Sequence, residues 1–287
     1  MPHQKTKALA GLNIGCLIMS VAGIFAKVIA WPATVIIAGR MVLGFPFVLL
    51  WLVWRQERLR LHSHKDFFLL MGLGAILAVH WITYFKAVQL STVATAIVAV
   101  HIGPILTTFL EPIITKTKLE FIDIVTAIIG FTGILIMVED FTLTSTMTQG
   151  ILFALLSALL MSIRTIYSRC FVKRYSGPLI MFYQLFFGAF LLFPLLPFFD
   201  FTITKIDIRN IFILAIFVTA IAHTLLLSSL KYISARSSGI MMMVQPLYAT
   251  IFAAILIHEI PSVRLAIGGI LILSATITET VKHSRPR

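Results

Sequence analysis

The sequence has little charge, few cysteines and no enzyme signature. Only 12% of its 287 residues are charged, whereas soluble domains carry roughly 25%. Its two cysteines, Cys16 and Cys170, form no CxxC pair, which argues against a disulfide framework or a zinc site. No P-loop, GxGxxG or GxSxG motif occurs, so neither an ATP-driven pump nor a common nucleotide- or serine-dependent enzyme is predicted. We expect no cofactor and no bound metal.

The sequence is instead rich in long hydrophobic stretches, and 59% of its residues are hydrophobic. A membrane-spanning helix needs ~20 mostly apolar residues, and ten such stretches leave only short loops and two tails. We therefore predict an all-α membrane protein with ten transmembrane helices. These lie near residues 9–30, 33–54, 67–86, 92–113, 120–138, 150–171, 178–199, 209–230, 236–257 and 262–281.

Lysine and arginine are distributed unevenly between the predicted loops. With the N-terminus in the cytoplasm, the tails and the even-numbered loops hold sixteen of the 23, the other loops four and the spans three. Cytoplasmic loops carry an excess of Lys and Arg, so we predict that both termini are cytoplasmic, in a bacterial inner (plasma) membrane. The net charge of +12 does not indicate a nucleic-acid partner, because the basic residues form no single soluble face.

The second half of the chain repeats the first at a shift near 143 residues. Residues inside the spans recur at this shift, in the pairs Arg40/Gln184, Gly44/Gly188, His80/His223 and, with one residue of slippage, Pro104/Pro246. Because each half has five spans, an odd number, the two copies insert with opposite orientation. The sequence thus predicts two inverted five-helix repeats, residues 1–141 and 149–287.

Several local features resemble the drug/metabolite transporter superfamily, EamA type, over nearly the whole chain. They are the polar residue four before a glycine (Arg40, Gln184), the small-residue links after the third and eighth spans (Leu90-Ser91-Thr92, Tyr232-Ile233-Ser234-Ala235), the mid-span prolines (Pro104, Pro246) and the acid in His258-Glu259. The first half departs from this pattern, because Lys116-Thr117-Lys118 stands where the acid is expected.

This resemblance implies a central cavity between two pseudo-symmetric halves that alternate in their access to the two sides. Members of the superfamily export amino acids, nucleosides and drugs, or carry sugars and other metabolites. The shared motifs indicate the fold and do not indicate the substrate.

Ionisable residues inside spans are the candidate site residues, because each costs about 2.5–3.5 kcal/mol or more at mid-helix unless it faces a cavity or partner. In the fourth span, His101, Pro104, Thr108 and Glu111 follow one another at spacings of three, four and three. These spacings predict one helical face with a helix break, an imidazole and a carboxylate, and hence a proton or substrate site. Alternatively, Glu111 pairs with the lysines of the following loop.

His80 and His223 occupy matching places, which the pseudo-two-fold axis would put on opposite sides of the cavity. Histidine titrates near neutrality and suits a coupled proton. Alternatively, each ring binds a backbone carbonyl and holds the bundle together. Trp81 and Tyr84 flank His80 and could stack on a planar substrate, although an interfacial anchoring role is favoured for both.

Arg40 and Arg164 lie well inside their spans, and a guanidinium can grip a carboxylate or phosphate with two parallel hydrogen bonds. Alternatively, Arg164 extends towards the cytoplasmic headgroups, and Arg40 pairs with Glu111 or with helix-end carbonyls. The final candidates are in the ninth span. Gln245 and Tyr248 adjoin Pro246, which matches Pro104 in suggesting paired kinked helices around a transport site.

We predict a secondary transporter, an exporter of a small metabolite, that works by alternating access with proton coupling through Glu111 and the two histidines. A carboxylate-bearing solute such as an amino acid is favoured, because Arg40 and Arg164 outnumber Glu111 in the interior. A nucleotide-like or phosphorylated solute satisfies the same argument. A distant alternative is an intramembrane metalloenzyme that uses His80, His101, His223 and Glu111. The expected partners are the substrate, the lipid bilayer and protons, and the chain is a monomer or a homodimer.

Overall fold

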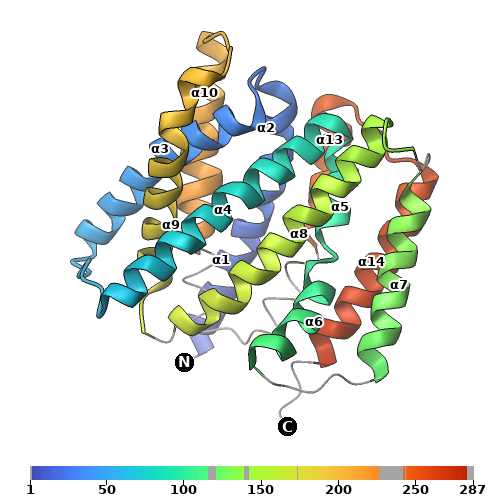
Figure 1. Cartoon of the computed structure of the whole chain (residues 1–287), viewed down its shortest axis with the longest axis horizontal. Helices are drawn as coiled ribbons and strands as arrows, with labels where there is room; N and C mark the ends of the chain where they lie inside the picture. The colour runs from blue at the N-terminus through green and yellow to red at the C-terminus, as the bar shows by residue number, and fades with distance from the viewer. Residues whose placement is uncertain are drawn as a thin grey trace.

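The chain forms a bundle of helices (Figure 1). The computed structural model describes residues 2–115, 121–138, 142–172, 174–225, 242 and 244–282, and these contain no strand. The helices are α1 (Pro2–Ser20), α2 (Ala22–Val28), α3 (Ala33–Trp54), α4 (His64–Leu90), α5 (Val93–Val100), α6 (Gly103–Thr115), α7 (Phe121–Met137), α8 (Thr146–Phe171), α9 (Gly177–Leu192), the 3-10 helix η1 (Phe193–Phe198), α10 (Lys205–Ile213), the π-helix η2 (Leu214–Ala222), α13 (Gln245–Ile257) and α14 (Val263–Lys282).

All ten predicted hydrophobic segments coincide with helices over their described parts, so the all-α class is confirmed for those residues. Within the described ranges, seven helical segments are long and apolar enough to cross a membrane, and three shorter ones are apolar. Helices are expected here because each satisfies its own backbone hydrogen bonds in hydrocarbon. Residues 226–230 of the eighth predicted span and 236–241 and 243 of the ninth lie outside the described part of the chain.

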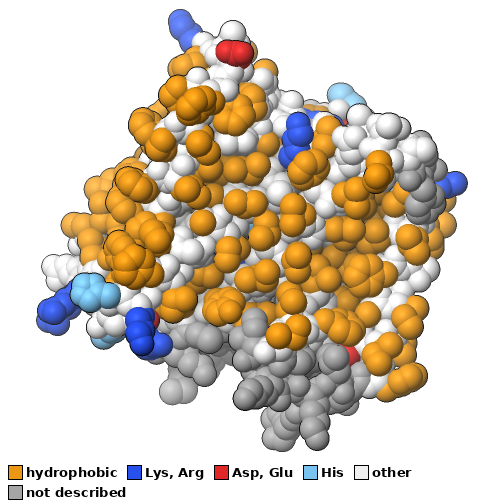
Figure 2. All heavy atoms as spheres, in the orientation of Figure 1, with side chains coloured by type: hydrophobic (Ala, Val, Ile, Leu, Met, Phe, Trp, Pro, Cys, Tyr) orange, Lys and Arg blue, Asp and Glu red, His pale blue; other side chains and the backbone are white. Residues whose placement is uncertain are grey.

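The outer surface of the bundle is apolar. Figure 2 shows one face covered by hydrophobic side chains, with most of the Lys and Arg side chains near its edges. Large exposed side chains come from several helices, among them Leu50, Ile128 and Phe190. Monomeric soluble proteins rarely expose so large a contiguous apolar patch. This surface is therefore the one that faces lipid.

The fourth predicted span is broken. α5 ends at Val100 and α6 begins at Gly103, so His101 and Ile102 stand between two helices. The cause is Pro104, which has no N–H to donate to the carbonyl of Val100, four residues earlier, and whose ring crowds that carbonyl. Consequently His101 and Glu111 do not share one helical face, and the spacing-based prediction of such a face was wrong. At the matching place in the ninth span, α13 begins at Gln245 with Pro246 in its first turn.

Residues of the two chain halves are packed together extensively. α4 packs against α8 and α9, α3 against α9, and α7 against α14. The contact between α7 and α14 is closest at Gly133 and Gly268. A Cβ on Gly268 would lie 2.5 Å from the carbonyl oxygen of Gly133, where a side chain cannot fit. These glycines therefore let two helices of the same chain touch through their backbones.

We expect Gly268→Ala to lower the free energy of unfolding by about 1–3 kcal/mol, because the new methyl group must push α14 away from α7. Gly72, on α4, is the matched control, because a Cβ there would meet nothing within 4 Å. Gly72→Ala should raise stability by roughly 0.5–1 kcal/mol through lower chain entropy. Thermal unfolding of both purified variants measures the difference, and equal midpoints would contradict this account of the α7–α14 contact.

Candidate functional site

Arg40 lies at the centre of the strongest polar cluster in the described residues. It projects from α3 and is 2% exposed. Its Nε donates to Oγ1 of Thr219 on η2 at 2.5 Å. Its guanidinium carbon lies 3.8 Å from the ring centroid of Trp81 on α4, which is a cation–π contact. Three helices thus converge on one buried positive charge.

Gly44 explains how α3 comes close enough to η2 for this contact. It follows Arg40 by four residues and so lies one turn along the same face of α3. A Cβ on Gly44 would lie 3.2 Å from Cγ2 of Thr219, tighter than ordinary contact. The glycine that follows a polar residue by four, noted in the sequence, thus has a packing role beside Arg40.

A second arginine, Arg164 on α8, is held by α9. Its Nε donates to Oε1 of Gln184 at 2.8 Å, and its Nη2 lies 3.9 Å from the sulfur of Met181. Gln184 is fully buried, so this contact is inside the bundle. The alternative in which Arg164 extends towards the headgroups is therefore not what the structure shows.

The two paired histidines lie near these arginines. On α4, Nδ1 of His80 donates to the carbonyl of Ser157 on α8 at 2.9 Å, and the Ser157 hydroxyl donates to the carbonyl of His80 at 2.9 Å. The ring of His223, which directly follows η2, lies 5.5 Å from that of Trp81. His223 is within electrostatic reach of Arg40, Arg164 and His80. We use the name arginine cluster for two arginines, two histidines and their four contacting residues. The members are Arg40, Arg164, His80, His223, Trp81, Ser157, Gln184 and Thr219.

The arginine cluster holds a buried guanidinium, that of Arg40, and a half-buried one, that of Arg164, and neither has a described carboxylate partner. Among the described residues, the hydrogen-bond partners of Arg40 and Arg164 are uncharged, and neither arginine contacts Glu111. Burying an ion costs several kcal/mol unless a counter-charge offsets it. Tyr84, also buried, lies within electrostatic reach of Arg40. The described contacts thus leave the two guanidiniums without a carboxylate partner.

No hydrogen bond, ion pair or ring contact among the described residues joins His101, Glu111, Gln245 or Tyr248 to the arginine cluster. Nδ1 of His101 donates to the carbonyl of Ile97 on α5 at 2.7 Å, and the carbonyl of His101 accepts from the hydroxyl of Thr276 on α14 at 3.0 Å. Glu111 is half-buried on α6. On α13, Gln245 is buried and Tyr248 half-buried. No group of three potential metal ligands occurs among the described residues, so the four residues of the metalloenzyme alternative are not assembled.

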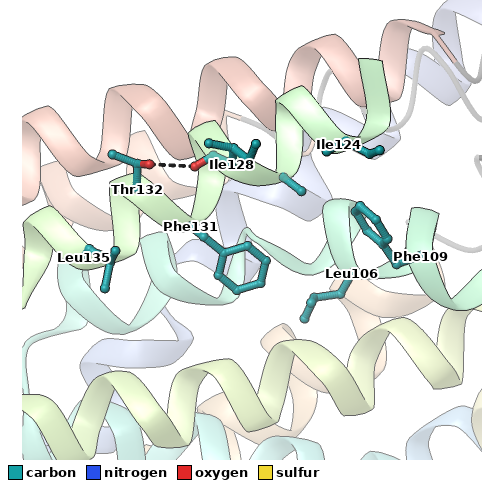
Figure 3. A pocket seen from close by; sticks show the side chains of 8 residues that line it. Leu106, Phe109, Ile124, Ile128, Phe131, Thr132 and Leu135 are labelled. Atoms are coloured by element: carbon teal, nitrogen blue, oxygen red, sulfur yellow. Dashed lines mark hydrogen bonds between the residues drawn. The ribbon is translucent and has the colours of Figure 1, made fainter. Parts of the chain in front are cut away.

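A surface groove between two helices also lies away from the cluster. It runs between α6 and α7 and is lined by apolar side chains such as Leu106, Phe109 and Phe131 (Figure 3). The one polar lining side chain, Thr132, donates to the carbonyl of Ile128 in its own helix at 2.7 Å. A groove with no free polar group in the lipid-facing surface suits acyl chains and cannot orient a polar solute.

A hydrogen-bonded contact joins the two halves where α4 begins. Asp66 sits in the first turn of α4, where the Ser63 side chain accepts its N–H at 3.1 Å. Oδ2 of Asp66 accepts from the Tyr175 hydroxyl at 2.6 Å, and Arg174 lies 3.3 Å away. Burial, and next the bond to Asp66, raise the pKa of Tyr175, which therefore stays a donor at neutral pH. Tyr175 also accepts from the N–H of His62 at 2.8 Å. We call this contact the α4 clasp.

A matching contact lies where α10 begins, at the opposite end of the bundle (Figure 1). Thr204 accepts the N–H of Asp207 at 3.1 Å, as Ser63 does for Asp66. Oδ1 of Asp207 accepts from the N–H of Ala30 at 3.4 Å, and Nε1 of Trp31 donates to the carbonyl of Thr202 at 2.7 Å. We call this contact the α10 clasp. Both clasps use an aspartate in a helix's first turn and an aromatic residue from a loop of the other half.

Glu259 forms a further link between the halves. Its Oε2 accepts from the N–H of Val93, at the start of α5, at 2.8 Å, and its Oε1 lies 3.6 Å from Nζ of Lys27. Lys27 also donates to the carbonyl of Ser91 at 2.6 Å. A carboxylate is favoured at a helix N-terminus. The acid singled out by the resemblance therefore anchors a loop of the second half to the first half.

Sequence reasoning missed Thr219 and Ser157. Thr219 precedes His223 by four residues, a spacing that would have placed both on one helical face. Ser157 gives no comparable signal, because a serine in an apolar span is common and only the three-dimensional structure sets it against His80. Gln184 was noted as the partner of Arg40 in the repeat, and its contact with Arg164 was not foreseen.

Comparisons with known proteins agree with this fold. The model of the EamA-like transporter family matches twice, at residues 6–139 and 148–278. "Uncharacterized transporter YxxF" of Bacillus subtilis is 23% identical over 285 residues, covering 98% of this chain and 91% of that protein. An uncharacterized transporter of Clostridium kluyveri is 28% identical over 206 residues, covering 68% and 64%. One crystal structure superposes with a TM-score of 0.68 at 17% identity over 98% of each chain, a likeness of fold.

Proposed function

Because the chain belongs to the EamA-like transporter family of the drug/metabolite transporter superfamily, we propose that it exports a small carboxylate-bearing metabolite, such as an amino acid. Export takes place across a bacterial inner membrane, with both termini in the cytoplasm. The bias of Lys and Arg supports this orientation, and α1 begins at the same end of the bundle at which α14 ends (Figure 1).

The observation that carries this proposal is the positive charge inside the arginine cluster, where Arg40 is buried and Arg164 half-buried. Arg40 and Arg164 have uncharged partners only, among the described residues. A substrate carboxylate would offset their charge and accept two parallel hydrogen bonds from a guanidinium. A phosphorylated or nucleotide-like metabolite offers the same acceptors and is the second candidate.

Alternating access of the two halves, residues 1–141 and 149–287, is the mechanism that we propose. The twofold match of the family model supports a duplicated chain. The two clasps support an inverted arrangement, because they use equivalent parts of the two halves at opposite ends of the bundle. Opening one end would require its clasp to break while the other holds. The binding site then faces one side at a time.

Proton coupling is part of the proposal, through Glu111 and the pair His80 and His223. We expect export to slow when the pH gradient is collapsed, and Glu111→Gln to remove that dependence. Export rates in cells with and without a protonophore measure both effects. An export rate that is unchanged by the protonophore, together with a wild-type export rate in Glu111→Gln, would remove proton coupling from the proposal.

Untargeted metabolite profiling tests the proposed activity. Cells that express the chain are compared with cells that carry an empty vector, with cytoplasm and medium sampled separately. We expect an unmodified carboxylate compound to fall inside and rise outside. A phosphorylated compound with this behaviour would favour the second candidate. The reverse movement would show import, and a new chemical species would favour an enzyme.

A further inference from the structure

Thr219 stands in a rare backbone conformation directly beside the arginine cluster. It lies in the π-helix η2, Leu214–Ala222, between α10 and His223. Its hydroxyl donates to the carbonyl of Leu214, five residues earlier, at 3.1 Å. π-Helices are rare and occur frequently at functional sites. Thr219 is itself fully buried.

The hydroxyl of Thr219 uses both of its hydrogen-bonding capacities. Its proton goes to Leu214, so its oxygen has a fixed orientation in which it accepts from Nε of Arg40. The ring of Trp81 covers one face of the same guanidinium at 3.8 Å. The remaining donors of Arg40 are Nη1 and Nη2, which no described protein group accepts. They lie side by side on the far edge of the guanidinium.

We propose that Thr219 is a positioning residue, which fixes Arg40 so that its Nη1–Nη2 edge receives a planar carboxylate of the substrate end-on. This inference rests on the proposed function and specifies how its site binds. The edge next to Nε is closed by Thr219, so a carboxylate can bind in one orientation only. A planar oxyanion with two oxygens matches the remaining pair of donors.

The π-helix gives this arrangement its geometry. Its wider turns change the direction of the side chains that follow, and Thr219 and His223 both meet the Arg40–Trp81 pair. Gly44 leaves room for the Thr219 methyl group at the α3 contact. Valine has nearly the same shape as threonine and lacks the hydroxyl. Thr219→Val therefore removes the hydrogen bonds with little change in packing.

The test measures carboxylate binding by the purified full-length chain. Melting midpoints are recorded with increasing sodium acetate or sodium glutamate, against sodium chloride at equal ionic strength. A ligand that binds the folded state raises the midpoint, and tighter binding gives a larger rise at the same ligand concentration. The variants are Thr219→Val, Thr219→Ala and Thr219→Ser, with Arg40→Gln as the reference without a site. Using two hydroxyl-free variants gives a result even when one of them does not fold.

We expect the wild-type chain to gain stability from a carboxylate and Arg40→Gln to gain none. Thr219→Val and Thr219→Ala should bind about tenfold more weakly, the order expected for a lost hydrogen bond to a charged group. Thr219→Ser should restore the wild-type response. A hydroxyl-free variant with a lower starting midpoint and an unchanged carboxylate response would overturn the positioning role. Equal responses in wild type and Arg40→Gln would instead overturn the proposed anion site.

Discussion

Replacing Arg40 by glutamine is expected to reduce export about 100-fold while the protein stays folded. Arg40 is buried among uncharged partners, so its charge is costly to the empty protein. Losing a buried, hydrogen-bonded charge from a recognition site costs about 2–5 kcal/mol of binding. Export at a fixed substrate concentration should therefore fall about 100-fold. Arg40→Lys should fail as well, because an ammonium cannot bind a carboxylate with two parallel hydrogen bonds.

The stability of the same variant separates a functional arginine from a structural one. Arg40→Gln loses the contact with Trp81 and also the cost of the buried charge, so its melting midpoint should match or exceed that of the wild type. Arg209, which is exposed on α10, provides the control, and Arg209→Gln should export normally. An Arg40→Gln protein that exports at the wild-type rate would contradict the assigned site.

Breaking the two clasps should open opposite ends of the protein. Asp66→Asn weakens the α4 clasp and Asp207→Asn the α10 clasp, each by the loss of charge-assisted hydrogen bonds. Each variant should therefore favour the state that is open at its own end. A bias of about 1.4 kcal/mol changes the population ratio about tenfold. Asp66→Asn should open the cytoplasmic end and Asp207→Asn the outer end.

Labelling of a single cysteine measures this opening. The reporter is Gln184→Cys in a chain whose own two cysteines are replaced by serine, and a charged, membrane-impermeant thiol reagent is applied to vesicles of either orientation. In each variant, labelling should accelerate about tenfold from one side only. That side should be the cytoplasmic one for Asp66→Asn and the outer one for Asp207→Asn. Asp200→Asn, at an exposed position near the α10 clasp, is the control. Acceleration from both sides in either variant would show that the clasps stabilise the fold without controlling access.

Much of the fold follows from the sequence, because spans depend on local properties. Twenty apolar residues must form a helix in hydrocarbon whatever their neighbours are. Some helix starts also follow from the sequence, because Pro32 directly precedes α3 and Pro104 is the second residue of α6. The predicted helical face through His101 and Glu111 was wrong, because the prediction assumed one continuous helix. Pro104 instead divides the span into α5 and α6.

The partners of the candidate side chains were less predictable, because they come from contacts between distant helices. Arg40 was correctly identified as a buried ionisable residue, yet its partner Thr219 follows 179 residues later. The π-helix that presents Thr219 has no sequence signature among the patterns for α-helices. His80 shows the opposite case. Its contact with a backbone carbonyl is the alternative foreseen for a buried histidine, and the carbonyl proved to belong to Ser157.

Counterflow in proteoliposomes is the most direct test of the central claim, that this chain moves a small anion through the arginine cluster. Vesicles with the purified wild-type chain are loaded with the unlabelled compound found by profiling, and the labelled compound is added outside. We predict transient accumulation of unmodified label in wild-type vesicles and none in vesicles with Arg40→Gln or without protein. Absence of accumulation in wild-type vesicles, or equal accumulation in Arg40→Gln vesicles, would contradict the account.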